Sequence, residues 1–252
     1  MQQHKTAGIA SIGILGLGRF GRLVAQLLGS DFEVRAFDPT LVDTAITADP
    51  WWCTEEEVGA ADLVIPCVPI NTFETCLVRL APLLRPGTLV MDVCSVKEYP
   101  LELLRSLLPR EVSFLTSHPL FGPDSASKGL SGCKMVFCEH RTDPERYQCI
   151  SAYLVSRGIE VLETTAAEHD REVARSQLLT HFIGRGLRDL GATPLPVDTE
   201  GYRRLLHILE VVGHDTWELY RDMNRYNRFS TQVRQDFLNS LYSVDKRLRD
   251  HA

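Results

Sequence analysis

The sequence predicts an α/β protein, with a doubly wound parallel sheet in the first two-thirds of the chain and an all-helical domain after it. Short apolar runs alternate with segments of helical spacing as far as Glu163, and a glycine-rich turn follows the first run. Only helical spacing appears after Glu163. Alternating strands and helices are typical of a parallel sheet with helices on both faces. We therefore expect two domains, residues 1–165 and residues 166–252.

Each element of the first domain follows from its pattern of apolar residues. The run Asp62–Val68 is almost continuously apolar, as expected of a strand that is covered on both faces. Strands are expected at Ser11–Leu15, Glu33–Phe37, Asp62–Val68, Thr88–Val93, Val112–Thr116, Lys134–Cys138 and Glu160–Glu163. Helices are expected at Arg19–Leu28, Thr72–Leu84, Glu98–Leu108 and Asp143–Ser156.

The second domain shows helical spacing with polar residues at the helix starts. A loop rich in proline and glycine, Gly191–Pro196, interrupts the pattern. Thr199 and Asp215 have the residue types that cap helix N-termini. Helices are expected over Ala166–Leu190, Thr199–Val212, Asp215–Tyr226 and Arg228–Leu248.

Composition narrows the class of protein. The 252 residues are 44% hydrophobic and carry a formal net charge of -6, which argues against a general nucleic-acid binder. The seven cysteines form no Cys-x-x-Cys pair, so we expect reduced thiols in a cytoplasmic protein. No apolar stretch is long enough to span a membrane. Residues 7–18 are apolar, but they lack the cleavage site of a signal peptide.

The glycine-rich turn has the spacing of a dinucleotide-binding fingerprint. It reads Gly16, Leu17, Gly18, Arg19, Phe20 and Gly21, and it lies between a predicted strand and a predicted helix. Glycines here allow a tight turn and a close approach of the backbone to a pyrophosphate at the helix N-terminus. This context favours a Rossmann domain over a glycine turn that binds no nucleotide.

Asp38 ends the second predicted strand, about 20 residues after Gly18, where an acidic side chain binds the ribose 2′-hydroxyl. A carboxylate repels a 2′-phosphate, so we favour NAD as the cofactor, with NADP as the alternative. The residues that follow strand ends are expected to line the same site, because strand carboxyl ends form the ligand crevice. These residues are Pro39, Cys67, Val68, Pro69 and Ser95.

Two later segments carry the residues expected to perform chemistry. Asp92–Lys97 and Ser117–Asp124 each lie at the carboxyl end of a strand, so Ser95, Lys97 and His118 should converge near the nicotinamide. Histidine is suited to accept a proton at neutral pH. The alternatives are a strand-end polar role for His118 and a turn-stabilising bond from Ser95. No Gly-x-Ser-x-Gly elbow or His-x-x-x-His pair supports a hydrolase or a metal site.

Several motifs together resemble the arogenate/prephenate dehydrogenases of tyrosine biosynthesis, especially the plant-type arogenate dehydrogenases. The resemblance extends over essentially the whole chain. Its motifs are Gly16–Gly21, Asp92–Pro100, Ser117–Ser125, Glu168–Asp170, Ser176–His181, Pro196–Tyr202 and Tyr226–Arg228.

The resemblance implies a Rossmann domain and a helical domain that forms most of a homodimer interface. It also implies that hydride leaves the ring carbon bearing the 4-hydroxyl, carbon dioxide is lost and the ring becomes aromatic. His118 then corresponds to the proton acceptor, and Ser95 to the residue that orients it. The residues expected to bind substrate are Ser95, His118, Gln177, Thr180, His181, Asp215, Arg225 and Arg228.

The chain departs from the family pattern in two places. Many bacterial members hold the substrate carboxylate with an Arg in a Thr-Arg motif, whereas the matching stretch Ile208–His214 contains none. Lys97, Arg225 and Arg228 remain as candidates for that carboxylate. Plant-type members usually use NADP and lack an acidic residue where Asp38 stands, so the expectation of NAD is retained.

Arogenate and prephenate differ in the side chain, which carries an ammonium only in arogenate. An acidic residue before the penultimate helix favours arogenate in plant-type members, and Asp215 aligns with it. The alternative role of Asp215 is to cap a helix. Rival readings of the whole chain are a β-hydroxyacid dehydrogenase or imine reductase, a non-catalytic NAD sensor, and a helical dimerisation module. Enzymes of the first kind usually have a catalytic Lys or Asp on the long helix, and the matching stretch of this chain, Ser176–His181, contains no such Lys.

Overall fold

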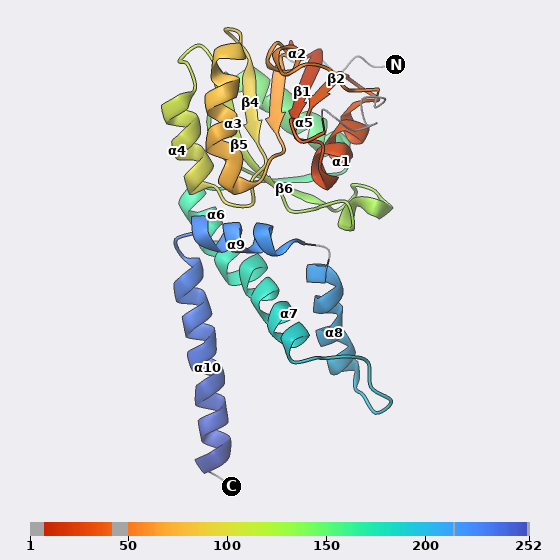
Figure 1. Cartoon of the computed structure of the whole chain (residues 1–252), viewed down its shortest axis with the longest axis vertical. Coiled ribbons are helices and arrows are strands. Elements are labelled where there is room, and N and C mark those ends of the chain that lie inside the picture. Colours follow the sequence, from red (N-terminus) through yellow and green to blue (C-terminus); the bar gives the residue numbers. More distant parts are fainter. Residues whose placement is uncertain (1–7, 42–49, 214, 251–252) are drawn as a thin grey trace. The chain divides into compact units, whose positions relative to one another are not determined.

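The computed structural model describes residues 8–41, 50–213 and 215–250, which form two units (Figure 1). Unit 1 comprises residues 1–166 and unit 2 comprises residues 167–252, so the division lies one residue beyond the predicted boundary. His214, part of the stretch without an arginine, lies outside the described residues. In the described part of the chain, no helix is both long enough and apolar enough to cross a membrane.

Seven strands in the described part of unit 1 form one sheet in the order β2-β1-β3-β4-β5-β6-β7. Strands β1 to β5 are parallel, β6 is antiparallel to β5, and β7 is parallel to β6. The strands are β1 (Ser11–Leu15), β2 (Glu33–Phe37), β3 (Leu63–Pro66), β4 (Leu89–Asp92), β5 (Ser113–Pro119), β6 (Lys134–Arg141) and β7 (Glu160–Glu163).

The sheet is thus mostly rather than wholly parallel. The connection from β5 to β6 contains only a short 3-10 turn, Ser125–Lys128, and no helix that could carry the chain back across the sheet. A parallel pair needs such a crossover, so β6 returns beside β5 in the opposite direction.

Five helices in the described part of unit 1 connect these strands: α1 (Arg19–Leu28), α2 (Glu55–Gly59), α3 (Phe73–Leu80), α4 (Glu98–Leu107) and α5 (Pro144–Ser156). Figure 1 shows α3 and α4 in front of the strands and α5 behind them. The sequence did not predict α2, because five residues are too few for an amphipathic pattern. A reciprocal capping box between Thr54 and Glu57 stabilises its start.

One apolar cluster in the core of unit 1 lies against the face of the sheet that α1 covers. Ile12, Ile14, Ile65, Met91 and Leu115 are all at most 5% exposed. The chain runs from β1 outward to β2 and then returns to β3, on the other side of β1. In such sheets the ligand crevice opens at the carboxyl ends of the strands beside this reversal. The core therefore fixes the strand ends from which a site is built.

Unit 2 is helical: α6 (Ala166–Val173), a π-helical turn (Ala174–Leu178), α7 (Leu179–Asp189), α8 (Glu200–Gly213), α9 (Trp217–Tyr226) and α10 (Ser230–Asp250). The π turn interrupts the single helix predicted over Ala166–Leu190. Such turns occur often at functional sites. Gly184 of α7 lies so close to α8 that a Cβ there would be 2.7 Å from a methyl group of Val212. Glycine is needed for this helix–helix approach.

Thr199 lies before α8 as predicted, and its hydroxyl accepts a hydrogen bond from the Tyr202 amide at 3.2 Å. The prediction that Asp215 caps the next helix is wrong. The cap of α9 is Thr216, whose hydroxyl accepts from the Leu219 amide at 3.1 Å. The carboxylate of Asp215 is therefore not used for capping.

Candidate active site

Of the three glycines in the turn of unit 1, only Gly18 has free space beside it for a phosphate. Gly16 has φ +94°, and a Cβ there would be 2.5 Å from the carbonyl oxygen of Cys67. A Cβ on Gly21 would be 1.9 Å from the carbonyl oxygen of Gly16. No atom lies within 4 Å of the position a Cβ would take on Gly18. The turn is therefore packed tightly at Gly16 and Gly21 and open at Gly18, at the N-terminus of α1. An open backbone at a helix N-terminus suits a pyrophosphate.

Asp38 lies at the end of β2, beside this turn. Its carboxylate accepts hydrogen bonds from the Leu17 amide at 2.8 Å and from the amide and hydroxyl of Thr40 at 2.9 and 2.7 Å. These bonds hold an acidic side chain next to the glycine turn, the position from which ribose hydroxyls are bound.

The remaining expected cofactor residues lie around the same strand ends. The Cys67 amide donates to the Leu15 carbonyl at 2.6 Å, which places the segment Cys67–Pro69 beside the turn. Pro39 follows Asp38 directly. Arg19 forms an exposed ion pair with Asp124 at 2.8 Å. The side chain of Phe20 packs against the apolar core, so only its backbone is available at the helix N-terminus.

A buried ion pair joins the strand ends that carry Ser95 and His118. Asp92 and Lys97 are both fully buried, and Lys97 Nζ lies 2.6 Å from each carboxylate oxygen of Asp92. Lys97 also donates to the carbonyl of Ser117. Asp92 accepts from the amides of Cys94 at 2.8 Å and Ser117 at 3.1 Å, and the Ser117 hydroxyl donates to the Asp92 carbonyl at 2.6 Å.

This network fixes the backbone on both sides of the expected catalytic pair. Half-buried Ser95 lies between Asp92 and Lys97 in the chain, and His118, only 2% exposed, follows Ser117 directly. Burial raises the pKa of Asp92, while the Lys97 ammonium and the two amides oppose that rise. Lys97 is thus a structural cation. Its suggested role as a ligand of the substrate carboxylate is wrong, because its ammonium is buried and already bound.

A second polar cluster lies within unit 2. His181 of α7 is buried, and its Nε2 lies 3.3 Å from a carboxylate oxygen of Asp215. The guanidinium of Arg185 donates to the carbonyls of Asp215 and Thr216 at 3.0 and 3.1 Å. It also stacks over the rings of Trp217 and Tyr220, with distances of 5.0 and 4.7 Å to the centroids.

Several buried atoms in this cluster have no hydrogen-bond partner among the described residues. They are Oε1 of Gln177, Nδ1 of His181 and Nε of Arg185. The three residues follow one another at intervals of four along one helical face, and half-buried Thr180 adjoins them. Buried polar atoms are usually bonded, so this set indicates a place where a polar ligand binds. Burial lowers the pKa of His181; Asp215 opposes that change and Arg185 adds to it.

The two arginines that were expected to bind substrate, Arg225 and Arg228, are exposed, and no contact joins them to this cluster in the described residues. Arg225 stacks on its neighbour Tyr226, and Arg228 on Phe229. The motif around Arg228 has a structural part: Asn227 donates to the carbonyl of Asp170 at 2.7 Å. This bond joins two of the motifs in the sequence, Glu168–Asp170 and Tyr226–Arg228.

Sequence reasoning missed Asp92 and Ser117 as a network and Arg185 altogether. The spacing of Gln177, His181 and Arg185 is a helical repeat, and it is the one signal that could have identified Arg185. No cluster of His, Cys, Asp or Glu in the described ranges is arranged to hold a metal ion.

Comparison with known protein families gives two matches. Residues 47–163 match the model of the prephenate dehydrogenase nucleotide-binding domain. Residues 186–252 match the model of the TYRAAT1-like C-terminal domain.

Two relatives come from Arabidopsis thaliana. Arogenate dehydrogenase 2, chloroplastic, is 30% identical over 98% of this chain and 72% of its own length. Arogenate dehydrogenase 1, chloroplastic, is 32% identical over 86% of this chain, which spans 36% of that longer protein.

Solved structures share the fold at lower identity. Arogenate dehydrogenase of Synechocystis superposes with a TM-score of 0.69 at 23% identity, covering 96% of this chain and 92% of that one. Prephenate dehydrogenase of A. aeolicus, in complex with hydroxyphenyl propionate and NAD+, gives a TM-score of 0.74 at 20% identity, covering 97% and 92%.

Proposed function

Because the chain belongs to the arogenate/prephenate dehydrogenase family, we propose that it oxidatively decarboxylates arogenate to tyrosine, or prephenate to 4-hydroxyphenylpyruvate. It is an NAD(P)-dependent oxidoreductase. The observation that carries the proposal is the position of His118. This buried histidine follows the Asp92–Lys97–Ser117 network, at the sheet edge where the glycine turn and Asp38 also lie.

When bound, the nicotinamide supplies the hydride acceptor. We assign to His118 the role of general base. It accepts the proton of the ring 4-hydroxyl while the carbon that bears this hydroxyl loses hydride. The new carbonyl draws the electrons of the breaking carbon–carboxylate bond into the ring, and carbon dioxide leaves. His118 then returns its proton to the phenolate oxygen. Ser95 and the buried network hold His118 in position, and such orientation lowers the barrier to reaction.

Formation of NADH with arogenate and prephenate offered separately tests the function. Turnover of either supports the proposal, and faster turnover of arogenate supports the assignment of substrate. If the protein binds nucleotide but turns over neither arogenate nor prephenate, the proposed function is contradicted. A hydroxyacid dehydrogenase or an NAD sensor is then favoured.

NAD is the cofactor that Asp38 favours. We expect Asp38→Asn to raise the ratio of kcat/KM with NADP to that with NAD by about tenfold or more, because a 2′-phosphate no longer meets a carboxylate. Asparagine keeps an oxygen that can accept from the Leu17 amide. Initial rates at varied cofactor concentration measure the ratio. Glu33→Gln, at the far end of β2, is the control. An unchanged ratio in Asp38→Asn would contradict the role of this residue.

Arogenate is the substrate that we propose as preferred. Asp215 is half-buried, is not a helix cap, and its carboxylate lies 3.3 Å from Nε2 of His181. A carboxylate there suits an ammonium and disfavours a keto acid. We expect Asp215→Asn to shift the kcat/KM ratio about 10- to 100-fold towards prephenate. Kinetics with both substrates measure this. If Asp215→Asn leaves the ratio of kcat/KM for the two substrates unchanged, Asp215 does not select the substrate and has a structural role.

Arg185 is proposed as the residue that positions Asp215. We expect Arg185→Met to raise the pKa of His181, because the cation that lowers it is lost, and to raise KM for arogenate more than it changes kcat. Asp215→Asn should lower the same pKa further. NMR titration of the His181 ring measures both shifts. Arg188→Met, on the same helix, is the matched control. Shifts of the same sign in the two variants would contradict this arrangement.

We also propose a homodimer in the cytoplasm. α10 exposes a row of large apolar side chains at helical spacing, Leu238, Leu241, Tyr242 and Leu248, which fits an interface between copies of the chain. All seven cysteines are free thiols, consistent with a reducing compartment. Sedimentation of the purified protein tests the dimer.

A further inference from the structure

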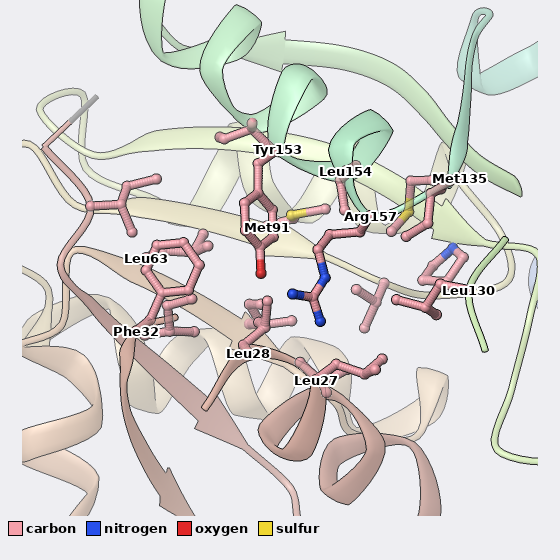
Figure 2. Close-up of a pocket in the computed structure, with 18 of the residues that line it drawn as sticks. Leu27, Leu28, Phe32, Leu63, Met91, Leu130, Met135, Tyr153, Leu154 and Arg157 are labelled. Carbon is pink, nitrogen blue, oxygen red and sulfur yellow. The ribbon is translucent and has the colours of Figure 1, made fainter. Parts of the chain in front are cut away.

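Unit 1 contains an apolar cavity to which the proposed reaction assigns no role. Its lining reaches Phe20 of the glycine turn and Pro119, which follows His118. It has a volume of about 110 Å³ and lies between α1 and α5 (Figure 2). Its floor is formed by the sheet and its sides by the two helices. The lining includes Ile12, Leu63, Ile65 and Met91 from the sheet, Leu28 from α1 and Leu154 from α5.

The topology of the sheet explains the cavity. α1 follows β1 towards one edge of the sheet, whereas α5 joins β6 and β7 at the other edge. No described helix follows β3 or β4 on this face, because right-handed crossovers place α3 and α4 on the opposite face. Leu63, Ile65 and Met91 are therefore buried from solvent but border unfilled space between α1 and α5. A cavity of this size and lining is suited to one hydrocarbon ring.

The mouth of the cavity is the end that Arg157 lines. Arg157 forms an ion pair there with Asp31, which precedes the lining residue Phe32. Tyr153 and Arg157 extend from α5 across the cavity towards Leu27 and Leu28 of α1 (Figure 2). The Tyr153 hydroxyl donates to Oδ2 of Asp31 at 2.8 Å, and Arg157 Nη1 lies 3.1 Å from the same oxygen. Burial and the nearby Asp31 raise the pKa of Tyr153, which keeps this hydroxyl protonated.

Both charged groups at the mouth retain unused hydrogen-bonding atoms. Oδ1 of Asp31 accepts no hydrogen bond from the described residues, and within the same ranges Nε and Nη2 of Arg157 have no acceptor. Each side chain is 36% exposed. A ligand carboxylate can therefore bind the Nε–Nη2 edge of Arg157, and a ligand ammonium can bind Asp31, while the existing pair stays intact.

We propose that this cavity binds a free α-amino acid whose side chain is a hydrocarbon ring, the class represented by L-phenylalanine. The ring occupies the apolar interior, the carboxylate binds Arg157 and the ammonium binds Asp31. Apolar pockets with a few convergent polar groups are the usual form of small-molecule sites. The interior offers no partner to a phenolic hydroxyl, so L-tyrosine binds here more weakly. Asp31 and Arg157, which bind the charged groups of the amino acid, have no role in the proposed reaction.

Calorimetric titration of the protein without nucleotide tests the proposal with three probes: L-phenylalanine, 3-phenylpropionate and phenethylamine. We expect L-phenylalanine to bind one site per chain, about tenfold or more tightly than either singly charged probe. At ten times its Kd it should raise Tm by about 3–5 °C. L-Tyrosine should be about tenfold weaker than L-phenylalanine at this site. These readouts need no turnover, so they stay valid if the proposed reaction is wrong.

Variants locate the binding. Arg157→Gln and Asp31→Asn should each weaken L-phenylalanine binding about tenfold or more, while Arg110→Gln, a surface control, leaves it unchanged. Leu63→Phe fills the interior and should abolish binding, and Leu28→Phe repeats that test from the helix side if the first variant does not fold. No binding of L-phenylalanine at 10 mM, about the upper limit of a useful site, would overturn the proposal. Binding that survives both charge variants would also overturn it.

Discussion

Replacement of His118 by asparagine is expected to lower kcat by about 10²- to 10⁴-fold, the contribution of a well-placed general base. The side chain is 2% exposed, and the backbone before it is held by the Asp92–Lys97–Ser117 network. Asparagine fills much of the same space and can bond a hydroxyl, but it cannot accept a proton at neutral pH. Substrate and nucleotide should therefore still bind.

The measurement is NADH formation with arogenate and NAD, together with the Kd for NAD from calorimetry. His140→Asn is the matched control, because His140 is exposed on β6 and stacks on Tyr147. We expect the control to keep kcat within about twofold, as surface changes usually do. A variant of His118 that keeps more than about a tenth of kcat would contradict the role of a general base.

Loss of the Lys97 ammonium is expected to have the largest effect on stability. Lys97→Met leaves the carboxylate of Asp92 buried and without its cation, which typically costs about 3–5 kcal/mol of unfolding free energy. The Ser117 carbonyl loses a donor as well. Urea unfolding measures the loss, and near-neutral stability of the variant would contradict the proposed role of the pair.

The double variant Asp92→Asn/Lys97→Met provides the control, because it removes both charges. It should recover a large part of the loss, since removing both partners is far less costly than stranding one. The activity of the double variant should remain low, because the network that fixes the backbone beside His118 and Ser95 is lost.

The destabilisation caused by Lys97→Met is expected to be larger at high pH than at low pH. Burial raises the pKa of Asp92, and loss of the lysine raises it further. The folded variant then binds a proton more readily than the unfolded chain, whose carboxyl has a pKa of about 3.9. The destabilisation of Lys97→Met is therefore greatest above the folded pKa and shrinks as the pH falls through it. Unfolding of the single variant at pH 8 and pH 5 measures this, with a smaller penalty expected at about pH 5.

Much of the fold could be predicted because its signals are local. The helix Arg19–Leu28 and the strand Glu33–Phe37 have the predicted bounds. Apolar periodicity and turn residues specify such elements within a few positions. The short helix α2 was missed and the direction of β6 was not predicted, because a five-residue helix has no period and strand direction depends on a distant partner.

The candidate site divides in the same way. The sequence by itself determined the glycine turn, Asp38 and the positions of Ser95 and His118 after predicted strands, because strand ends and turn chemistry follow from local pattern. Only the tertiary structure decided that Lys97 is buried against Asp92, that Asp215 faces His181 and that Arg185 holds the turn before α9. A lysine in sequence has the same charge whether it binds a substrate or a buried aspartate. Burial and the partner decide between these roles, and both depend on segments that meet only when the chain folds.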